Sequence, residues 1–481
     1  MVNYEKFSSE AFTLAERNGA KYADVRFVET EYENIEVTDG IPELIDRSFD
    51  FGVGVRVIVD GAWGFASTAD VGLKSIRDTA RLAAEIAKAS AKLKKRSVEL
   101  APVEAVSGSY ETPITINPFA VSLTEKIDYL AELCRLMAAV QGITRTTASM
   151  SFKKLYQYFA STEGTTTRQT IYHSGAGIQC NAGSGHRGRS TRSYPNSSGQ
   201  YESKGYELIK EQYFERSAPE IAEQAVALLS AKECPQGEKD IVLDGPMLSL
   251  QIHESIGHPL ELDRVFGHER NFSGTSFATP DKLGDLQYAS EIVNVVNDPT
   301  AFFGLGSFGY DDEGVPAKKT YLIKDGVLVN YISSREMAAR IGKESTACNR
   351  AEGWENVPIN RMTNTILEPG KESFDDLIAD IDDGIYMETV ASWSIDDARE
   401  SFTMGTEIGW EIKNGKLGEM IKSPTYSDET LRFWRSCDGI ADMGNYKIWG
   451  TPNCGKGQPP QNMAVSQGCS PARFRRVKVG V

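Results

Sequence analysis

Residues 239–259 of the chain read KDIVLDGPMLSLQIHESIGHP. Residues 239–243 end in an apolar run bounded by turn residues, which predicts a short strand. Asp244 and Pro246 then supply an N-cap and a proline in the first turn of a helix. We therefore expect a strand that leads directly into a helix over residues 246–257, as part of an α+β fold.

The last turns of this predicted helix carry an uncommon group of side chains. His253 and His258 flank Glu254, in a chain that has only five histidines. Neutral imidazole is a good ligand for zinc and similar divalent ions, and a carboxylate beside the first ligand is placed to take a proton from water. The pattern is similar to the H-E-x-x-H of many metalloproteases, with one extra residue between the histidines. We interpret it as a metal site; the alternative is a hydrogen-bonded core histidine with a chance spacing.

The extra residue changes the geometry of the histidine pair. On a straight α-helix, residues five apart point about 140° away from each other, whereas residues four apart are separated by about 40°. Gly257 is conformationally permissive, and Pro259 disfavours the helical conformation at His258. We therefore expect the helix to widen or to end there, so that His258 turns back toward His253.

A catalytic zinc site also needs a third protein ligand, and the spacing of residues leaves its identity open. Glu261 and His268 follow the pair closely, and the last fifth of the chain holds three cysteines, at positions 437, 454 and 469. Spacing alone favours Glu261, because a carboxylate three residues after the second histidine is similar to the arrangement in other zinc proteases.

The composition limits the class of protein. A length of 481 residues indicates two or three domains, and a net charge of −15 argues against nucleic-acid binding and favours neutral or basic peptides as ligands. We find no apolar run of about 18 residues and no signal-peptide pattern, so we expect a cytoplasmic protein without a membrane partner. The seven cysteines are odd in number and widely spaced, which does not indicate a disulfide framework.

The order of helical and strand patterns predicts a multidomain α+β fold with mixed and antiparallel sheets and flanking helices. We expect an N-terminal α+β domain, a middle α+β region with a connector, and a metal-binding catalytic domain, at residues 1–100, 101–232 and 233–481. Helices are predicted at residues 4–17, 73–93, 123–140 and 206–231. Residues 183–199 are small and polar, which indicates a loop, with an active-site flap as the alternative.

Several further stretches resemble one family along nearly the whole chain. They are His253-Glu254-x-x-Gly257-His258-x-x-Glu261, Asp311-Asp312-Glu313-Gly314, Arg361-Met362-Thr363-Asn364-Thr365 and Asn453-Cys454-Gly455-Lys456. Together they are similar to the TldD/PmbA family of metalloproteases, whose members are also described as DNA gyrase modulators. Of the two kinds of subunit in that family, the chain resembles the TldD-like, catalytic one, which keeps the H-E-x-x-x-H.

This resemblance implies a metal site and an activity. It implies that His253, His258 and Cys454 hold one divalent ion per chain, with zinc as the expected metal. It thereby favours Cys454 over Glu261 as the third ligand. Glu254 is expected to act as the general base in a peptidase that hydrolyses extended or unfolded peptides.

The resemblance also implies a dimer, either with a second copy or with a noncatalytic relative, and no direct contact with nucleic acid. Two alternatives stay open: a metal-dependent amidase acting on small molecules, and a noncatalytic binding or assembly subunit with a structural metal. His268 and Gly306 are candidates for stabilising the oxyanion. Residues 311–313 are interpreted as a solvated turn, with capture of a substrate amino group as the alternative. Cys469 is interpreted as structural.

Overall fold

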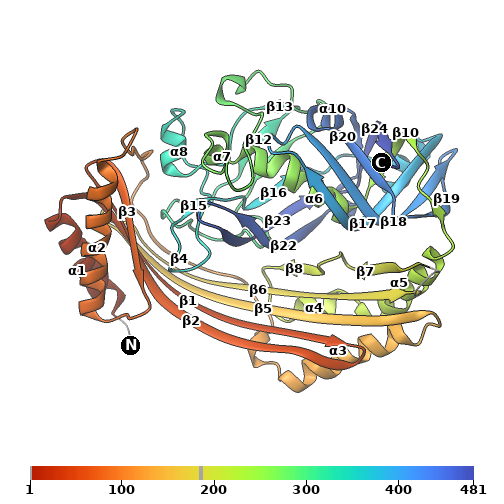
Figure 1. Ribbon diagram of the computed structural model, residues 1–481, viewed down its shortest axis with the longest axis horizontal. Coiled ribbons are helices and arrows are strands. Elements are labelled where there is room, and N and C mark those ends of the chain that lie inside the picture. Colours follow the sequence, from red (N-terminus) through yellow and green to blue (C-terminus); the bar gives the residue numbers. More distant parts are fainter. Residues whose placement is uncertain (1–2, 184–187) are drawn as a thin grey trace.

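The computed structural model describes residues 3–183 and 188–481 (Figure 1). A long, curved sheet from the N-terminal half lies below a C-terminal half that is built around two further sheets. Parallel and antiparallel pairs both occur in these sheets. The multidomain α+β fold with mixed sheets, predicted from the sequence, is confirmed. None of the helices in the described part of the chain has the length and apolar character needed to span a bilayer.

The curved sheet runs in the order β3-β2-β1-β5-β6-β4, and β7 and β8 also pair with β6. Apolar and polar residues alternate along the long strands, so that one face is apolar and the other is polar. The strands of this sheet are β1 (Ala20–Thr38), β2 (Ile41–Val59), β3 (Ala62–Thr68), β4 (Ser107–Glu111), β5 (Ile143–Ser161), β6 (Thr166–Ala182), β7 (Ser190–Tyr194) and β8 (Gln200–Glu202).

Two groups of helices cover the apolar face of the curved sheet. One group packs at the end near β3 and the other at the opposite end, so that the polar face is left for the C-terminal half. The helices are α1 (Tyr4–Arg17), α2 (Leu73–Ala91), α3 (Leu123–Ala138), α4 (Glu207–Glu211) and α5 (Phe214–Leu228). The first three confirm the predicted helices. The fourth predicted helix is interrupted at Tyr213, whose backbone is left-handed, with a φ of 51°.

The two sheets of the C-terminal half differ in order and direction. One runs β17-β10-β24-β20-β18-β19-β9, with β21 paired to β24, and the other runs β13-β12-β11-β16-β23-β22. The first contains β9 (Lys232–Glu233), β10 (Gly237–Leu243), β17 (Asp383–Ile395), β18 (Ser401–Lys413), β19 (Lys416–Lys422), β20 (Thr425–Glu429), β21 (Cys437–Ile440) and β24 (Ala472–Val479). The second contains β11 (Val295–Asn297), β12 (Thr320–Lys324), β13 (Val327–Leu328), β16 (Asn364–Leu367), β22 (Lys447–Lys456) and β23 (Gln461–Cys469).

Short elements complete this half. They are the paired strands β14 (Asn349–Arg350) and β15 (Ile359–Asn360), and the helices α6 (Gly245–Ile252), α7 (Leu262–Val265), α8 (Arg335–Ala339), α9 (Phe374–Ala379) and α10 (Thr430–Arg435).

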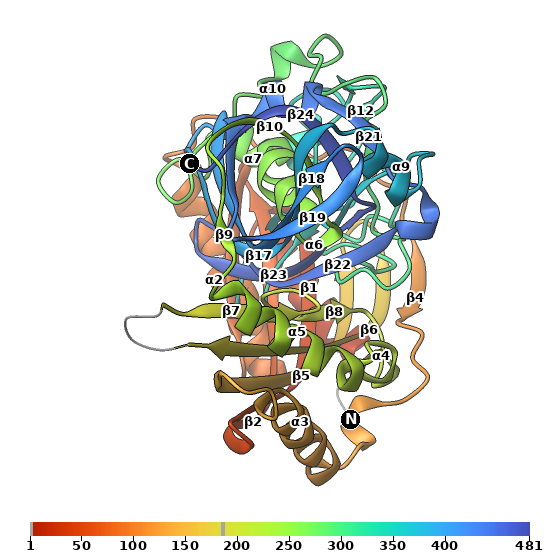
Figure 2. The same cartoon turned by 90° about the vertical axis from the view of Figure 1, so that its right-hand side faces the viewer.

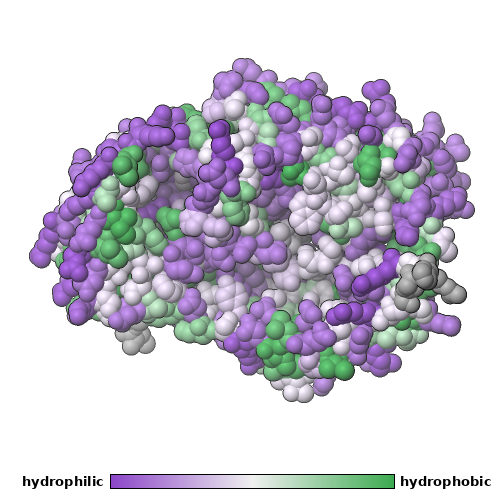
Figure 3. All heavy atoms as spheres, in the orientation of Figure 1, coloured by the Kyte–Doolittle hydropathy of each residue, from purple (hydrophilic) through white to green (hydrophobic). Residues whose placement is uncertain are grey.

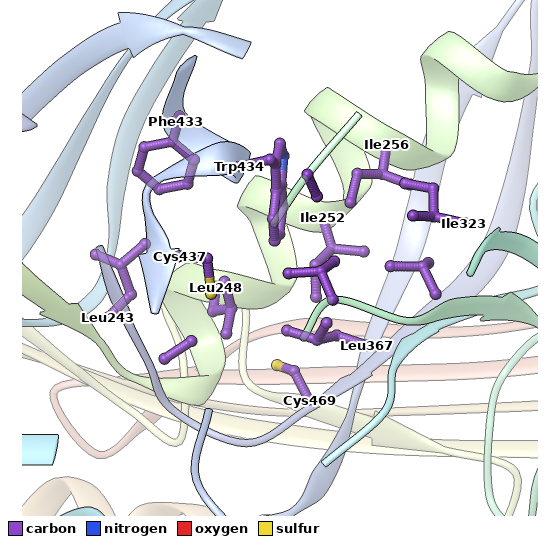
Figure 4. Packing of buried hydrophobic residues seen from close by; sticks show 14 of the residues in the cluster. Leu243, Leu248, Ile252, Ile256, Ile323, Leu367, Phe433, Trp434, Cys437 and Cys469 are labelled. Carbon is purple, nitrogen blue, oxygen red and sulfur yellow. The ribbon is translucent and has the colours of Figure 1, made fainter. Parts of the chain in front are cut away.

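Helix α6 is held between the two sheets. It packs against β17 of one sheet and against β16, β22 and β23 of the other, and Figure 2 shows it surrounded by strands. Leu248 and Ile252 point into a core that also contains Trp434, Leu367 and Cys469 (Figure 4). A helix that is apolar on all sides is expected to be buried in this way. Packing from two sides therefore fixes the position of the helix and of the turn that follows it.

The curved sheet joins the first two predicted regions of the chain. Its β1 and β5 pair along most of their length, so that residues 20–68 and 107–202 contribute to one sheet. The domain boundary near residue 100 stays a prediction. Within the predicted loop at residues 183–199, the loop assignment is wrong for β7, which pairs with β6. Residues 184–187 of that stretch lie outside the described residues.

Candidate metal centre

The site begins where β10 leads into α6. One carboxylate oxygen of Asp244 accepts a hydrogen bond of 2.7 Å from the backbone N–H of Met247, and Pro246 lies in the first turn. The other oxygen accepts a hydrogen bond of 3.0 Å from the backbone N–H of Thr389 on β17. The cap predicted from the sequence is confirmed, and it also ties the start of the helix to the neighbouring strand.

The helix widens where the two histidines lie. After α6 the chain forms a π-helical turn, His253–Gly257, and then a 3-10 turn that begins at His258. The backbone N–H of His258 donates to the carbonyl of His253, five residues earlier, which places one residue above the other. The widening predicted from Gly257 and Pro259 is confirmed.

Cys454 forms a compact group with the two histidines. Its Sγ lies 3.3 Å from Nε2 of His253 and 3.5 Å from Nε2 of His258. The imidazole rings are 4.7 Å apart between centroids and nearly perpendicular, and all three side chains are buried. Among the residues that the structure describes, their ligand atoms form a potential metal-binding group, with all separations within 4.8 Å.

The surroundings of Cys454 favour its thiolate. Cys454 lies on β22, and the Arg361 guanidinium donates a hydrogen bond of 2.5 Å to its backbone carbonyl. Burial alone would raise the pKa of the thiol, but His253, Arg361 and His258 lower that pKa well below its usual value. Burial likewise opposes protonation of His253, yet the charge of Cys454 raises the pKa of His253 to about 9. Burial lowers the pKa of His258 well below its usual value.

These three donors fit a zinc-like ion. Thiolate sulfur and imidazole nitrogen are zinc ligands, with bonds of about 2.3 Å and about 2.0 Å respectively. A tetrahedral ion with such bonds separates sulfur from nitrogen by about 3.5 Å. The observed sulfur–nitrogen distances of 3.3 and 3.5 Å agree with that value.

Glu261 lies behind His258 and outside the ligand group. One of its oxygens is 2.8 Å from Nδ1 of His258, and the other accepts a hydrogen bond of 3.1 Å from the backbone N–H of Met362. A carboxylate on Nδ1 fixes the ring so that Nε2 is presented to a metal. The preference for Glu261 as third ligand, which spacing alone favours, is therefore not supported. The contact of Glu261 with Nδ1 instead fixes the orientation of the His258 ring.

Glu254 is bound by Arg399, a residue that the sequence analysis did not identify. Nη1 of Arg399 donates a hydrogen bond of 2.5 Å to Oε2 of Glu254, and both side chains are largely buried. The backbone of Arg399 is left-handed, with a φ of 65°, and its carbonyl accepts a hydrogen bond from Thr430. No local motif marks Arg399, because it lies in a turn between β17 and β18, far from Glu254 in the chain.

Two other predicted residues have partners away from the metal-binding group. His268 is 3.3 Å from the guanidinium of Arg340, and the backbone N–H of Gly306 donates to the side chain of Asn364. Neither arrangement supports the predicted role in stabilising an oxyanion.

The acidic turn at residues 311–313 is buried, which neither of its two interpretations anticipated. Asp312 forms a salt bridge of 3.3 Å with Arg26, and Glu313 forms one of 3.4 Å with Arg56. Both arginines lie on the curved sheet. The turn therefore connects that sheet to the C-terminal half, so it is neither solvated nor free to capture a substrate amino group.

The fold and the site together define a class: an α+β chain with a buried His-His-Cys donor set and an adjacent carboxylate, as in metal-dependent hydrolases. Family models of the PmbA/TldA metallopeptidase match as domain 1, central domain and C-terminal domain, at residues 23–87, 116–229 and 236–480. The chain belongs to the PmbA/TldD metallopeptidase family, which confirms the resemblance seen in the sequence.

Relatives and solved structures agree with this assignment. The chain is 32% identical to a metalloprotease of Methanocaldococcus jannaschii, over 87% of this chain and 89% of that one. A putative modulator of DNA gyrase from Thermotoga maritima has a TM-score of 0.78 at 19% identity, covering 99% of this chain and 100% of that chain. TldE from Thermococcus kodakarensis has a TM-score of 0.73 at 14% identity, with coverage of 99% and 100%. These two structures share the fold.

Proposed function

We propose that the chain is a peptidase that uses one divalent metal ion, held by His253, His258 and Cys454. The observation that carries this proposal is the approach of one thiol to two imidazoles, at 3.3 and 3.5 Å, at the end of a helix that also carries Glu254. Three protein ligands leave one coordination position open, as in catalytic zinc sites. Zinc is the proposed metal because the donors are nitrogen and sulfur.

The proposed roles of the residues follow from their contacts. When bound, the ion would lower the pKa of a water molecule and polarise the carbonyl of the scissile peptide. Glu254 acts as the general base, which takes a proton from water and passes it to the leaving amine. Arg399 holds Oε2 of Glu254, so the proposal assigns the proton transfer to Oε1. Glu261 keeps the ring of His258 in the orientation that ligation needs.

Extended or unfolded peptides are the proposed substrates. The proposed ligand group is buried within the chain, which a folded domain could not enter. Such a segment can bind through main-chain hydrogen bonds to a strand, with little dependence on its sequence. The proposed partner is a second copy or a noncatalytic member of the family, and the proposed compartment is the cytoplasm, where a thiol ligand stays reduced.

Metal content and peptide hydrolysis test this function on the purified full chain. Wild type and Glu254→Gln should each carry about one divalent ion per chain, and Cys454→Ala should carry none. Wild type should cleave unstructured peptides, Glu254→Gln should keep only a small residual rate, and Cys454→Ala should not cleave them. Cys469→Ala is the matched control, because this buried cysteine lies in the hydrophobic core. Full activity of Glu254→Gln, or undiminished metal in Cys454→Ala, would contradict the proposal.

A further inference from the structure

A cavity of about 500 Å³ lies between the polar face of the curved sheet and the C-terminal half. On one side it is lined by side chains from β1, β5 and β6, among them Tyr32, Lys153 and His173. On the other side it is lined by residues of the C-terminal half, among them Arg350 and Met463. The face of the molecule seen in Figure 3 is mainly hydrophilic, with its apolar residues in small separate groups. A partly enclosed cavity is the usual place for recognition of a small ligand or a peptide side chain.

The cavity adjoins the candidate metal centre. Met463 lines the cavity and lies directly opposite Cys454 in the antiparallel pair of β22 and β23. Directly opposed residues of such a pair place their side chains on the same face of the sheet. Cys454 and a residue that lines the cavity therefore lie side by side on one face of this strand pair, which places the cavity next to the candidate metal centre.

Two cationic side chains that line the cavity, Lys153 and Arg350, make their closest polar or aromatic contacts with neutral groups. Lys153 lies over the ring of Tyr32, with its ammonium 5.1 Å from the centroid. Arg350 donates hydrogen bonds to the backbone carbonyls of Met362 and Ala464, at 3.1 and 2.9 Å. In the described part of the chain, neither Lys153 nor Arg350 forms a salt bridge with a carboxylate.

The carboxylates that line the cavity are already engaged elsewhere. Asp311 accepts hydrogen bonds from three backbone N–H groups. Asp312 accepts hydrogen bonds from the side chains of Arg26 and Gln157. Glu352 accepts a hydrogen bond from a backbone N–H of β23. None of these three carboxylates forms a salt bridge with Lys153 or Arg350, and the salt bridge that Asp312 does form is with Arg26.

His173 completes the group of basic side chains. It lies directly opposite Lys153 in the pair of β5 and β6, while Tyr32 lies opposite Lys153 on β1. Burial, together with the charges of Lys153 and Arg350, lowers the pKa of His173 to about 3. The imidazole is therefore neutral near pH 7, and it can donate a hydrogen bond without adding to the repulsion between the two cations.

We propose that this cavity binds a carboxylate of the peptide substrate, held by Lys153 and Arg350 with His173 beside them. The inference rests on the proposed function, because it names the substrate class of the same site. Two cations that lack a salt-bridge partner in a partly enclosed cavity carry a desolvation cost, and an anionic group placed between them would relieve it. Arginine and lysine both form strong charge-assisted hydrogen bonds with carboxylates. The carboxylate is either an acidic side chain or the carboxyl terminus of the peptide.

The cavity is proposed to prefer acidic peptides, whereas the net charge of the whole chain favours neutral or basic ones. The net charge of −15 favours neutral or basic peptides at long range. Inside the cavity, the charges nearest to the peptide determine which peptides bind, because interactions at a few ångströms are screened less than those across the surface.

Peptide binding to the Glu254→Gln variant tests this inference without turnover. The probes are fluorescent hexapeptides that differ only by Glu or Gln at one position, each with a free or an amidated carboxyl terminus. Binding is followed by fluorescence anisotropy at pH 7. Peptides with the recognised carboxylate should bind about tenfold or more tightly than their neutral counterparts. Tighter binding of Glu peptides than of Gln peptides would show recognition of an acidic side chain. Tighter binding of peptides with a free carboxyl terminus than of amidated ones would show recognition of the terminus.

Charge variants in the cavity assign the preference to its residues. Lys153→Met should remove most of the preference, and Lys153→Glu should shift it toward Lys-containing peptides. Lys154→Met is the matched control, because Lys154 is the next residue of β5, faces the opposite side of the sheet and lies near Tyr172. Arg350→Lys is a second variant that keeps the charge while removing the planar fork, and it should weaken the preference.

The possible outcomes separate this inference from the proposed function. Equal binding of acidic and neutral peptides, no binding of either, or a preference that Lys153→Met leaves intact would each overturn the inference. Peptide cleavage by wild type without any acidic preference would leave the proposed function standing. A clear acidic preference in binding, with no cleavage by metal-loaded wild type, would support the cavity assignment while contradicting the peptidase.

Discussion

Nη1 of Arg399 lies 2.5 Å from Oε2 of Glu254, in an ion pair that is largely shielded from water. The arginine adopts a left-handed backbone to make this contact, a conformation that carries strain outside glycine. Strained residues of this kind are found at functional sites more often than elsewhere. We interpret Arg399 as a residue that positions the side chain of Glu254.

Replacing Arg399 tests this positioning role. Arg399→Met should lower kcat by about tenfold or more, with little change in KM and none in metal content, because the carboxylate loses its fixed orientation. Arg399→Lys should recover part of the loss. The Arg399→Met/Glu254→Gln double variant should be no slower than Glu254→Gln alone. Arg192→Met is the control, since Arg192 is buried in an ion pair with Glu407. Additive losses in the double variant would show that Arg399 acts independently of Glu254.

Glu261 should influence metal affinity through the ring of His258. Glu261→Gln weakens the hydrogen bond at Nδ1 and should lower metal affinity by about 10- to 100-fold. Competition with a fluorescent chelator measures this affinity. Glu269→Gln is the control, because Glu269 pairs with Lys456 and Arg264 as Glu261 does, whereas the hydrogen bond to Nδ1 of His258 is made by Glu261. Equal losses in both variants would point to the cluster, and not to ring orientation, as the cause.

Gly257 should be sensitive to the smallest side chain. A Cβ atom there would come within 2.0 Å of Sδ of Met362, so Gly257→Ala must displace that side chain. We expect a loss of about 1–3 kcal/mol in stability and weaker metal binding, because the widened turn shifts. Thermal unfolding measures the first effect. Adding Met362→Ala should restore part of the stability. Gly418→Ala, whose Cβ would meet no atom closer than 3.6 Å, should have little effect.

His173 should make the protein less stable in acid. Its pKa is lowered to about 3 in the folded chain, whereas an unfolded histidine titrates near 6.5. Between these values the unfolded chain binds the extra proton, so stability is lost as the pH falls below about 6.5. At pH 5 the loss amounts to at most about 2 kcal/mol. Urea unfolding at pH 7 and pH 5 should show a larger loss for wild type than for His173→Gln. Identical losses would contradict this account.

Local sequence was sufficient to predict the ligand-bearing helix. Asp244 and Pro246 specify the start of α6, and Gly257 and Pro259 indicate where it widens, because capping and backbone preferences act within a few residues. The proposal of Cys454 as third ligand needed the family resemblance, because Cys454 lies on a strand about 200 residues away and no spacing rule reaches that far.

Other features of the site depend on tertiary contacts that no short motif encodes. The pairing of Lys153 with His173 follows from the register of β5 against β6. The contact between Arg399 and Glu254 follows from the packing of a turn against the helix end. The burial of residues 311–313 depends on arginines of the curved sheet. Because these partners are distant in the sequence, three adjacent acids alone predicted a solvated turn.

The position of Cys454 also has a consequence for the timing of activity during synthesis. Both histidines leave the ribosome about 200 residues before the cysteine, and the strand that carries the thiol, β22, pairs with β23, which follows it in the chain. Because metal affinity depends on all three ligands, binding is coupled to this late step of folding. A nascent or truncated chain that ends before residue 454 therefore lacks the complete proposed ligand set. Proteolytic capacity would then arise only in a molecule whose C-terminal strands have docked.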